Sequence, residues 1–367
     1  MAVTNFAGLN SKQKIVWSRD VWSAARDQMF VKKFLGTGPG AMIQRITELT
    51  KTEKGEKVLM QLVADLVDDG VIGDDEREGN EEEMQNFEVE LSIDLISHQV
   101  KNKGKMADQK TVINFREQAK DRLAYWLANR IDQLVFLALS GISFAFHNDG
   151  RPRVGSSFPS LAFAADVSAP TSKRHLMWNG TNLVTSNTAS IASGYTASYK
   201  MIVDAVAYAK DHYIKPLMAG GKEYYVILVK PGTLAQLKKD ADYQRAVVAL
   251  AQKDGAKSPW FTGGTVTIDG AVIHEHRLVY STTGAASGSK WGSSGTTNGT
   301  RTLLCGAQAL GMADLGTPEW VEKKFDYDSK VGISIDKMFG LLKPKFYSIY
   351  DESVQDFGVL AIDHYLG

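Results

Sequence analysis

Residues 73–95 read GDDEREGNEEEMQNFEVELSIDL, and the stretch changes character halfway along. Between Asp74 and Glu83 there are seven carboxylates and one basic residue, Arg77. From Phe87 onward apolar and polar residues alternate, which predicts a strand with one apolar face and one acidic face. We expect this strand to span 84–101 and to pair with the preceding extended chain. A two-stranded ribbon is marginal in water, so its apolar face needs another surface to cover it.

The overall composition is that of an ordinary globular protein with room for about two domains. The 367 residues are 44% hydrophobic, and Lys plus Arg equal Asp plus Glu at 42 each, which gives no global sign of nucleic-acid or membrane binding. No stretch approaches the ~20 apolar residues of a membrane span, and the first residues lack a signal-peptide pattern. The charge is nevertheless divided, because residues 48–105 hold 16 acids and 7 bases.

The clearest helix is predicted over 107–140, where apolar residues recur at helical spacing and Gly141 follows as a stop. Such a helix is a rod of about 50 Å. Its stripe is too apolar to be left in water, so we expect it to pack on a sheet that includes strands from the end of the chain. After a Ser- and Gly-rich insertion over 142–197, an α/β alternation begins, with helices predicted over 198–214 and 232–252.

Three features could carry chemistry, and each also has a plainer structural interpretation. His274 and His276 face one way on a predicted strand, but no third ligand is placed near them, and we expect no catalytic metal there. Cys305, the single cysteine, is either a nucleophile or a small buried residue. The acidic cluster over 74–83 is either a calcium site or a partner-facing patch. Since no catalytic motif or cofactor fingerprint is present, we predict neither catalysis nor a cofactor.

The order of elements resembles the major capsid proteins of tailed bacteriophages, which have the Hong Kong 97-type coat fold. A basic amphipathic arm, a long charged ribbon, a long helix, an insertion and an α/β domain follow one another. The similarity is closest to the short-tailed-phage branch. It is carried by KKFLGTGPGAMIQRITELTKTEKGEKVLMQLVADLVDDGVIGDDEREGNEEEMQNFEVELSIDLISHQV and RLAYWLANRIDQLVFLALSG, and more weakly by LAQLKKDADYQRAVVALAQKDGAKSPWFTGGTVTIDGAVIHEH.

The resemblance implies an α+β fold with a defined division of the chain. The implied segments are an N-terminal arm (1–40), an extended β-hairpin loop (41–105), a peripheral domain with the spine helix 107–140 and an insertion (106–197), an axial α/β domain (198–325), and C-terminal strands that return to the peripheral domain (326–367).

The resemblance also implies a function. The chain would be a major capsid protein that self-assembles as hexamers and pentamers into the icosahedral head shell around the double-stranded DNA genome of a tailed phage. Its partners would be copies of itself, a separate scaffolding protein, a portal protein and a decoration protein. Packaged DNA would be contacted non-specifically on the inner face, and no membrane would be involved. Assembly would take place in the cytoplasm of the bacterial host.

On this interpretation the ribbon lies across a neighbouring subunit, and its charge belongs to that contact. Repulsion from phosphates disfavours the ribbon as a DNA-binding element. The candidate contact residues are Lys51, Glu53, Lys54, Asp74, Asp75, Glu76, Glu81, Glu82, Glu83, Phe87, Val89 and Leu91. Two alternatives stay open: an encapsulin-like compartment shell with the same fold, and an intracellular α/β enzyme that uses His274, His276 or Cys305.

Overall fold

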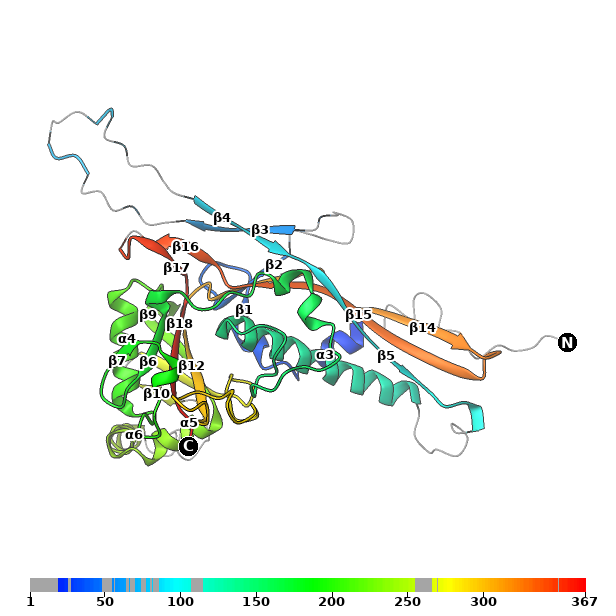
Figure 1. The fold of residues 1–367 in the computed structure, drawn as a ribbon. Coiled ribbons are helices and arrows are strands. Elements are labelled where there is room, and N and C mark those ends of the chain that lie inside the picture. The colour runs from blue at the N-terminus through cyan, green and yellow to red at the C-terminus, as the bar shows by residue number, and fades with distance from the viewer. Residues whose placement is uncertain are drawn as a thin grey trace.

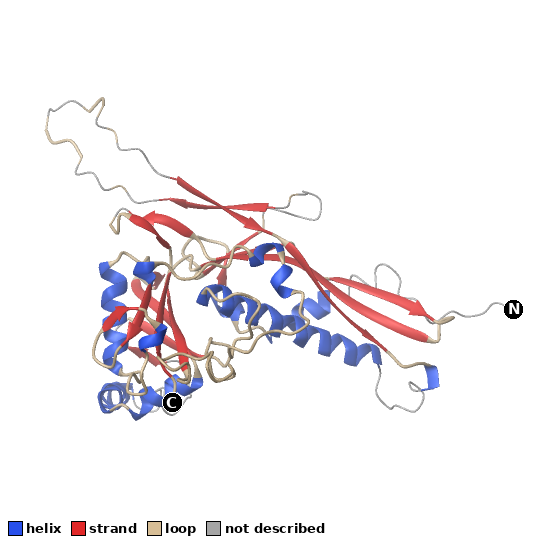
Figure 2. Ribbon diagram, in the orientation of Figure 1, coloured by secondary structure: helices blue, strands red, loops and turns tan. Residues whose placement is uncertain are grey.

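The fold is given by a computed structural model (Figure 1), which confirms an α+β architecture. The structure describes residues 19–25, 28–47, 55, 57–63, 66, 70–73, 77–79, 81, 86–106, 115–254, 266–268, 270–348 and 350–367. One sheet of eight strands forms a compact block with helices around it, as Figure 2 shows. A second sheet of six strands extends sideways from the block together with one long helix. The described chain is therefore elongated.

The long helix α3 (Phe115–Ser140) confirms the predicted spine helix over the described part of its range, since residues 107–114 lie outside it. Its last turns are buried on every side, from Leu134 to Ser140. The helix ends as predicted at Gly141, which has a φ of +65° and lies so close to the Ser168 carbonyl oxygen that no side chain would fit. Neither α3 nor any other described helix has the length and apolarity to cross a membrane.

The six-stranded sheet is centred on one long strand near the end of the chain. In spatial order its strands are β1 (Leu35–Gly36), β2 (Ile43–Ile46), β13 (Leu310–Asp314), β15 (Lys330–Leu342) and β14 (Glu319–Phe325), with β5 (Asp94–Lys101) also pairing with β15. We call the tapering part formed by β5, β15 and β14 the blade (Figure 1). Leu127 and Ile131 of α3 share one core cluster with Ile333, Ile335 and Phe339 of β15. This confirms that the spine helix packs on strands from the end of the chain.

A two-stranded antiparallel ribbon, β3 (Lys57–Val63) and β4 (Asn86–Ser92), lies beside the six-stranded sheet. The strand predicted over 84–101 is in fact two strands, because β4 pairs with β3 whereas β5 pairs with β15. The partner changes at Ile93, the single residue between them. Gly340 of β15 makes this crossing possible, since a Cβ atom there would lie 2.2 Å from the Ser92 carbonyl oxygen.

The eight-stranded sheet forms the core of the compact block. In spatial order its strands are β10 (Val266–Ile268), β11 (Ala271–Glu275), β9 (Lys222–Val229), β12 (Gly299–Cys305), β18 (Val359–Tyr365), β6 (His175–Trp178) and β7 (Leu183–Thr185), with β8 (Leu217–Ala219) pairing with β9. The helices α4 (Tyr199–Asp211), α5 (Pro231–Lys239) and α6 (Ala241–Asp254) contribute apolar residues to a cluster with this sheet. β10 and β11 pair as an antiparallel hairpin.

Two segments that were predicted to belong to the peripheral domain supply strands to the eight-stranded sheet. Of the C-terminal strands over 326–367, β15 joins the spine helix, but β18 pairs with β12 in the centre of the eight-stranded sheet. The reason is its sequence, VLAIDHY, which is buried along almost its whole length, as expected of a central strand. From the predicted insertion over 142–197, β6 and β7 extend the same sheet, with β6 parallel to β18.

The helix predicted over 232–252 is broken into α5 and α6 at Asp240. This residue has an extended backbone, and its carboxylate accepts hydrogen bonds from the N–H of Asp242 at 3.4 Å and of Tyr199 at 2.6 Å. An aspartate in this position caps the start of a helix, so it begins α6 and also holds the start of α4. The remaining short elements are the 3₁₀ turns η1 (Val31–Phe34), η2 (Phe158–Ser160), η3 (Ala162–Ala164), η4 (Ser172–Arg174) and η5 (Thr188–Ser190), and the hairpin of β16 (Lys345–Ser348) and β17 (Ser353–Asp356).

Candidate assembly surfaces

The inner face of the ribbon packs on the chain's own body at its root. Val58, Met60 and Leu91 are buried in a cluster with apolar residues of β2, β13 and β15. Leu91 is 0% exposed, so it offers no surface to a second subunit and is no longer a candidate contact residue. Val89, the cross-strand partner of the buried Met60, packs only partly against the same cluster. The chain therefore covers the root of the apolar face itself, as far as the Met60–Val89 pair.

The outer face of the ribbon is acidic, as the alternation predicts. Glu88 and Glu90 are exposed and flank an inward-facing valine. Glu90 forms an ion pair with Lys57 of β3, and Leu59, its direct cross-strand neighbour, is 45% exposed. An exposed ion pair contributes about 0–1 kcal/mol to the stability of a fold. The charge on this face is therefore available for recognition and is not needed to hold the subunit together.

Most of the remaining candidate contact residues lie outside the described residues: Lys51, Glu53, Lys54, Asp74, Asp75, Glu76, Glu82 and Glu83. Glu81 is described and exposed, and its carboxylate accepts a hydrogen bond from the Gly79 N–H at 2.8 Å. The backbone of Phe87 lies in β4, as predicted. In the described part of the connection between β3 and β4, Leu66 is 61% exposed and Ile72 is 81% exposed. Apolar as well as acidic side chains thus face outward there.

A buried carboxylate fastens the segment before the ribbon to the spine helix. Asp132 of α3 is 4% exposed and accepts hydrogen bonds from the backbone N–H groups of Phe30 at 3.0 Å and Val31 at 3.2 Å. Burial raises the pKa of Asp132 to about 6, although these hydrogen bonds act in the opposite direction. The two bonds hold the start of η1 on α3 and so fix the path of the chain that leads into β1 and β2.

The two histidines of the candidate metal motif lie in an aromatic cluster. The ring of His276 stacks on Phe30 and Phe136 at centroid distances of 4.3 and 4.9 Å, and burial lowers its pKa to about 4. His274 meets the ring of Phe34 edge-on at 5.2 Å. Among the residues that the structure describes, no three His, Cys, Asp or Glu side chains gather as a metal site. The two rings pack the arm segment around η1 against the end of β11.

Cys305 is a core residue, in agreement with the plainer of its two interpretations. It lies in β12 and is 0% exposed. Burial raises the pKa of its thiol to about 12. Because the thiolate is the reactive form of cysteine, a thiol held protonated in the core has no role as a nucleophile.

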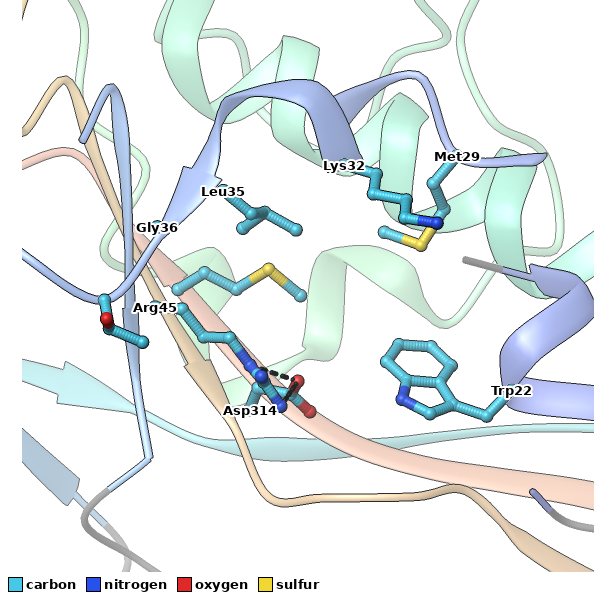
Figure 3. A pocket seen from close by; sticks show the side chains of 9 residues that line it. Trp22, Met29, Lys32, Leu35, Gly36, Arg45 and Asp314 are labelled. Atoms are coloured by element: carbon cyan, nitrogen blue, oxygen red, sulfur yellow. Dashed lines mark hydrogen bonds and ion pairs between the residues drawn. The ribbon is translucent and has the colours of Figure 1, made fainter. Parts of the chain in front are cut away.

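A cavity of about 220 Å³ lies between the arm segment and the six-stranded sheet (Figure 3). In its wall the buried Asp314 pairs with Arg45 at 2.6 Å and with the buried Lys337. The Nζ atom of Lys337 also lies 4.3 Å from the ring centroid of Trp22. Local sequence patterns do not predict this cluster, because its members come from distant segments. The one available signal was a charged residue at an otherwise apolar strand position, as in Asp314 of LGMAD.

A buried ion pair joins the end of α3 to the middle of the eight-stranded sheet. Arg301 of β12 donates two hydrogen bonds to Asp363 of β18, at 2.7 and 3.0 Å, and a third to the Ser140 carbonyl oxygen at 2.7 Å. His175 and Ser186 hydrogen-bond the same carboxylate at 2.7 and 2.8 Å. Burial alone would raise the pKa of Asp363, but the guanidinium and the histidine hold it well below its usual range. The network fixes the spine helix on the block.

These features, a ribbon, a blade with a spine helix and a compact α/β block, occur together in known proteins. A family model described as phage capsid protein matches residues 5–366. The chain belongs to the phage capsid protein family. A curated relative of this capsid-family chain, the major capsid protein of Pseudomonas phage KPP25, is 48% identical over 364 residues, which are 98% of this chain and 96% of the relative.

Solved capsid structures have the same fold as this member of the capsid family. The capsid of Ralstonia phage GP4 matches with a TM-score of 0.77 and 26% identity, over 92% of this chain and 91% of that one. The capsid of cyanophage Pam1 matches with a TM-score of 0.70 and 18% identity, over 100% of this chain and 96% of that one. The second likeness concerns the fold alone. Together they confirm the predicted tailed-phage coat fold.

Proposed function

We propose that the chain is the major capsid protein of a tailed phage. In this proposal it assembles as hexamers and pentamers into the icosahedral shell around a double-stranded DNA genome. The observation that carries the proposal is the 48% identity, over 98% of the chain, to the major capsid protein of Pseudomonas phage KPP25. The role is structural, and this identity favours it over an encapsulin-like compartment and over an enzyme. The burial of Cys305 and the stacking of His276 also argue against the proposed enzyme site.

In this proposal the block and the blade have separate roles. The block around the eight-stranded sheet is the axial domain, whose loops meet around five- and six-fold centres. The blade and α3 form the peripheral domain. The sheet memberships of β6, β7 and β18 support a division in which these three strands belong to the axial domain. The arm and the ribbon then serve as contacts between subunits.

The outer part of the ribbon is proposed to lie on a neighbouring subunit. On its inner face Val89 is only partly buried, although its cross-strand partner Met60 is buried. Leu66 and Ile72 are largely exposed, so this part of the chain offers apolar side chains to a partner. A head-to-tail contact between two different surfaces on copies of one chain forms a ring when the rotation from copy to copy closes. Its acidic charge would make assembly depend on salt.

The remaining partners follow from the same proposal. A separate scaffolding protein would set the size of the shell, a portal protein would occupy one vertex, and a decoration protein would bind the outside. Outside residues 48–105 the chain holds 35 bases and 26 acids, which suits non-specific contact with DNA phosphates on the inner face. Assembly is proposed to occur in the cytoplasm of the bacterial host.

Charge reversal on the ribbon tests the proposed function. Replacing Glu81, Glu82 and Glu83 together by Lys should leave the circular dichroism of the subunit unchanged, because exposed charges contribute little to a fold. Assembly followed by light scattering at low salt should become slower, since the mismatch recurs at every interface. Electron microscopy of the wild-type protein should show rings, tubes or shells.

The matched control reverses three exposed acids on the block, Asp211, Glu223 and Glu275, with the same change in net charge. Hydrogen exchange adds a second readout: amides of β3 and β4 should exchange faster in free subunits than in shells. A triple ribbon variant that assembles at the wild-type rate, or a wild-type chain that stays a monomer with or without scaffolding protein, would contradict the proposal.

A further inference from the structure

The far end of the blade holds two lysine side chains on one aromatic ring. The Phe325 ring of β14 lies over Gly332 of β15, where a Cβ atom would come within 2.8 Å of it. The Nζ atom of Lys101 in β5 lies 4.3 Å from the ring centroid, and that of Lys323 in β14 lies 5.3 Å from it. Both lysines pair with the same residue of β15, Gly332, and both are exposed. Their like charges repel each other, and an anion bound between them would remove that repulsion.

The hairpin turn beyond this ring is strained and held by ion pairs. Asp326, Tyr327 and Asp328 have φ values of +53°, +50° and +63°, a left-handed conformation that is unfavourable for residues other than glycine. Ion pairs of Lys330 with Asp326 at 2.9 Å and of Lys324 with Asp328 at 3.0 Å fasten the turn, and Tyr327 is fully exposed at its apex. Backbone strain of this kind is concentrated at functional sites. Both aspartates are paired within the turn, and Asp326 also lies within electrostatic reach of Lys101, so Lys323 keeps more of its charge than Lys101 does.

We propose that the end of the blade binds the acidic segment, residues 74–83, of a second copy of this chain. The receiving surface consists of Lys101, Lys103, Lys105 and Lys323, all exposed, and we call it the basic end. The acidic segment offers seven carboxylates and one arginine. The inference rests on the proposed function and deepens it, because it names the surface on which the ribbon of a neighbour ends.

The glutamates nearest to β4 cannot reach the basic end of their own chain. The chain is extended from Asn86 to Lys101, and 15 residues at ~3.3 Å place these two residues about 50 Å apart. Figure 1 shows β4 and β5 continuing in one direction. Glu81 lies five residues before Asn86, so it reaches at most about 18 Å from that residue. The lysine pair and Glu81–Glu83 can therefore meet only between different copies.

Nucleic acid is the competing anion, and the arrangement favours carboxylates. Binding to a nucleic-acid backbone gains affinity from basic residues that neutralise successive phosphates along the strand. Here Lys101 and Lys323 gather on a single ring, and the carboxylates of Asp326 and Asp328 lie in the adjoining turn. A short acidic peptide can match a surface of this limited extent, whereas a nucleic-acid strand would gain only the few phosphate contacts that the surface offers.

Reversal and exchange of charge test the inference. K101E/K323E is expected to slow assembly at low salt by at least about tenfold, or ~1.4 kcal/mol. Adding E81K/E82K/E83K to this variant should restore the rate to within about threefold of wild type, because opposite charges again face each other. K200E/K222E, at exposed positions of the block, changes the net charge equally and should leave the rate unchanged. Circular dichroism verifies folding, and K101Q/K323Q replaces the reversal if the glutamates disturb the sheet.

A zero-length cross-link gives a second readout. A carbodiimide joins an amine and a carboxylate only where they touch. In shells assembled from nitrogen-15-labelled and unlabelled chains, mixed-isotope peptides should connect Lys101 or Lys323 with residues 74–83. The ion pair of Lys324 with Asp328 supplies a positive control within one chain.

The outcomes separate this inference from the proposed function. If the variant that carries all five substitutions assembles normally and mixed-isotope peptides are found, both the inference and the proposed function are supported. If E81K/E82K/E83K slows assembly but K101E/K323E does not, the acidic segment binds elsewhere, and only the inference is overturned. If neither reversal has an effect, the intersubunit role of the ribbon fails as well. If K101E/K323E loses DNA binding and the exchange does not rescue assembly, the basic end is a nucleic-acid contact and the inference is overturned.

Discussion

Replacing Asp363 by Asn removes the negative charge from the network that joins the spine helix to the block. Asp363 is 0% exposed and Arg301 is 5% exposed, so water cannot solvate the guanidinium once the negative charge of Asp363 is removed. In the variant the guanidinium keeps its hydrogen bond to the Ser140 carbonyl oxygen but faces a neutral amide. A buried cation without its anion is the main source of the expected destabilisation.

Removing one partner of a buried ion pair costs about 3–5 kcal/mol. We expect Asp363→Asn to lose this much of the free energy of unfolding, a large share of the roughly 5–15 kcal/mol typical of a domain. The pKa of Asp363 lies below its usual range, so the unfolded state binds the proton more tightly than the folded state. The stabilisation is therefore present at neutral pH and is lost as the pH falls through the folded pKa. Asp363→Asn should lack this acid dependence.

Urea unfolding of free subunits, followed by circular dichroism from neutral to acid pH, measures both effects. Asp328→Asn is the matched control, since its ion pair with Lys324 is exposed and should be worth about 0–1 kcal/mol. In the R301M background, Asp363→Asn should lower the free energy of unfolding much less than it does in the wild-type chain, because Arg301, the partner of Asp363, is already absent. A loss below about 1 kcal/mol for Asp363→Asn, or additive losses in the double variant, would refute the reasoning.

Two further predictions concern other buried groups. Burial raises the pKa of Asp132 to about 6, so unfolding releases a proton and stability should fall as the pH rises from about 4 to about 6. Asp132→Asn should remove this dependence in urea unfolding, and an unchanged pH profile would contradict the assignment. The thiol of Cys305, with a pKa raised to about 12, should react with a chromogenic disulfide reagent only in urea. Labelling within minutes in the native state would show that β12 opens.

Local sequence patterns predicted the elements whose signals lie within one stretch of chain. The helical spacing before Gly141 gave the spine helix, and the alternation from Phe87 gave an acidic face and an apolar face on β4. Local patterns could not predict which strand pairs with which. The strand predicted over 84–101 changes partner at Ile93, and this depends on Gly340, about 250 residues away in sequence.

The same limit explains the errors on the candidate surfaces. In the sequence, Leu91 is an apolar strand residue with no visible packing partner. Only the fold shows that residues of β2, β13 and β15 already pack against it. The run VLAIDHY indicates a buried strand but not which sheet buries it. Lys101 and Lys323 looked like ordinary surface lysines, because the ring that gathers them belongs to a strand more than 200 residues from β5.

Because a single residue, Ile93, joins β4 to β5, a force that acts on the ribbon is transmitted directly to the blade. The ladder of β5 with β15 runs from Asp94 opposite Phe339 to Lys101 opposite Gly332. Its hydrogen bonds lie perpendicular to the strands, so a pull along β4 strains all of them at once in shear. A sideways pull would instead open them one after another. Tension between subunits of a shell would therefore pass along this strand into the blade and its spine helix, where many bonds resist it together.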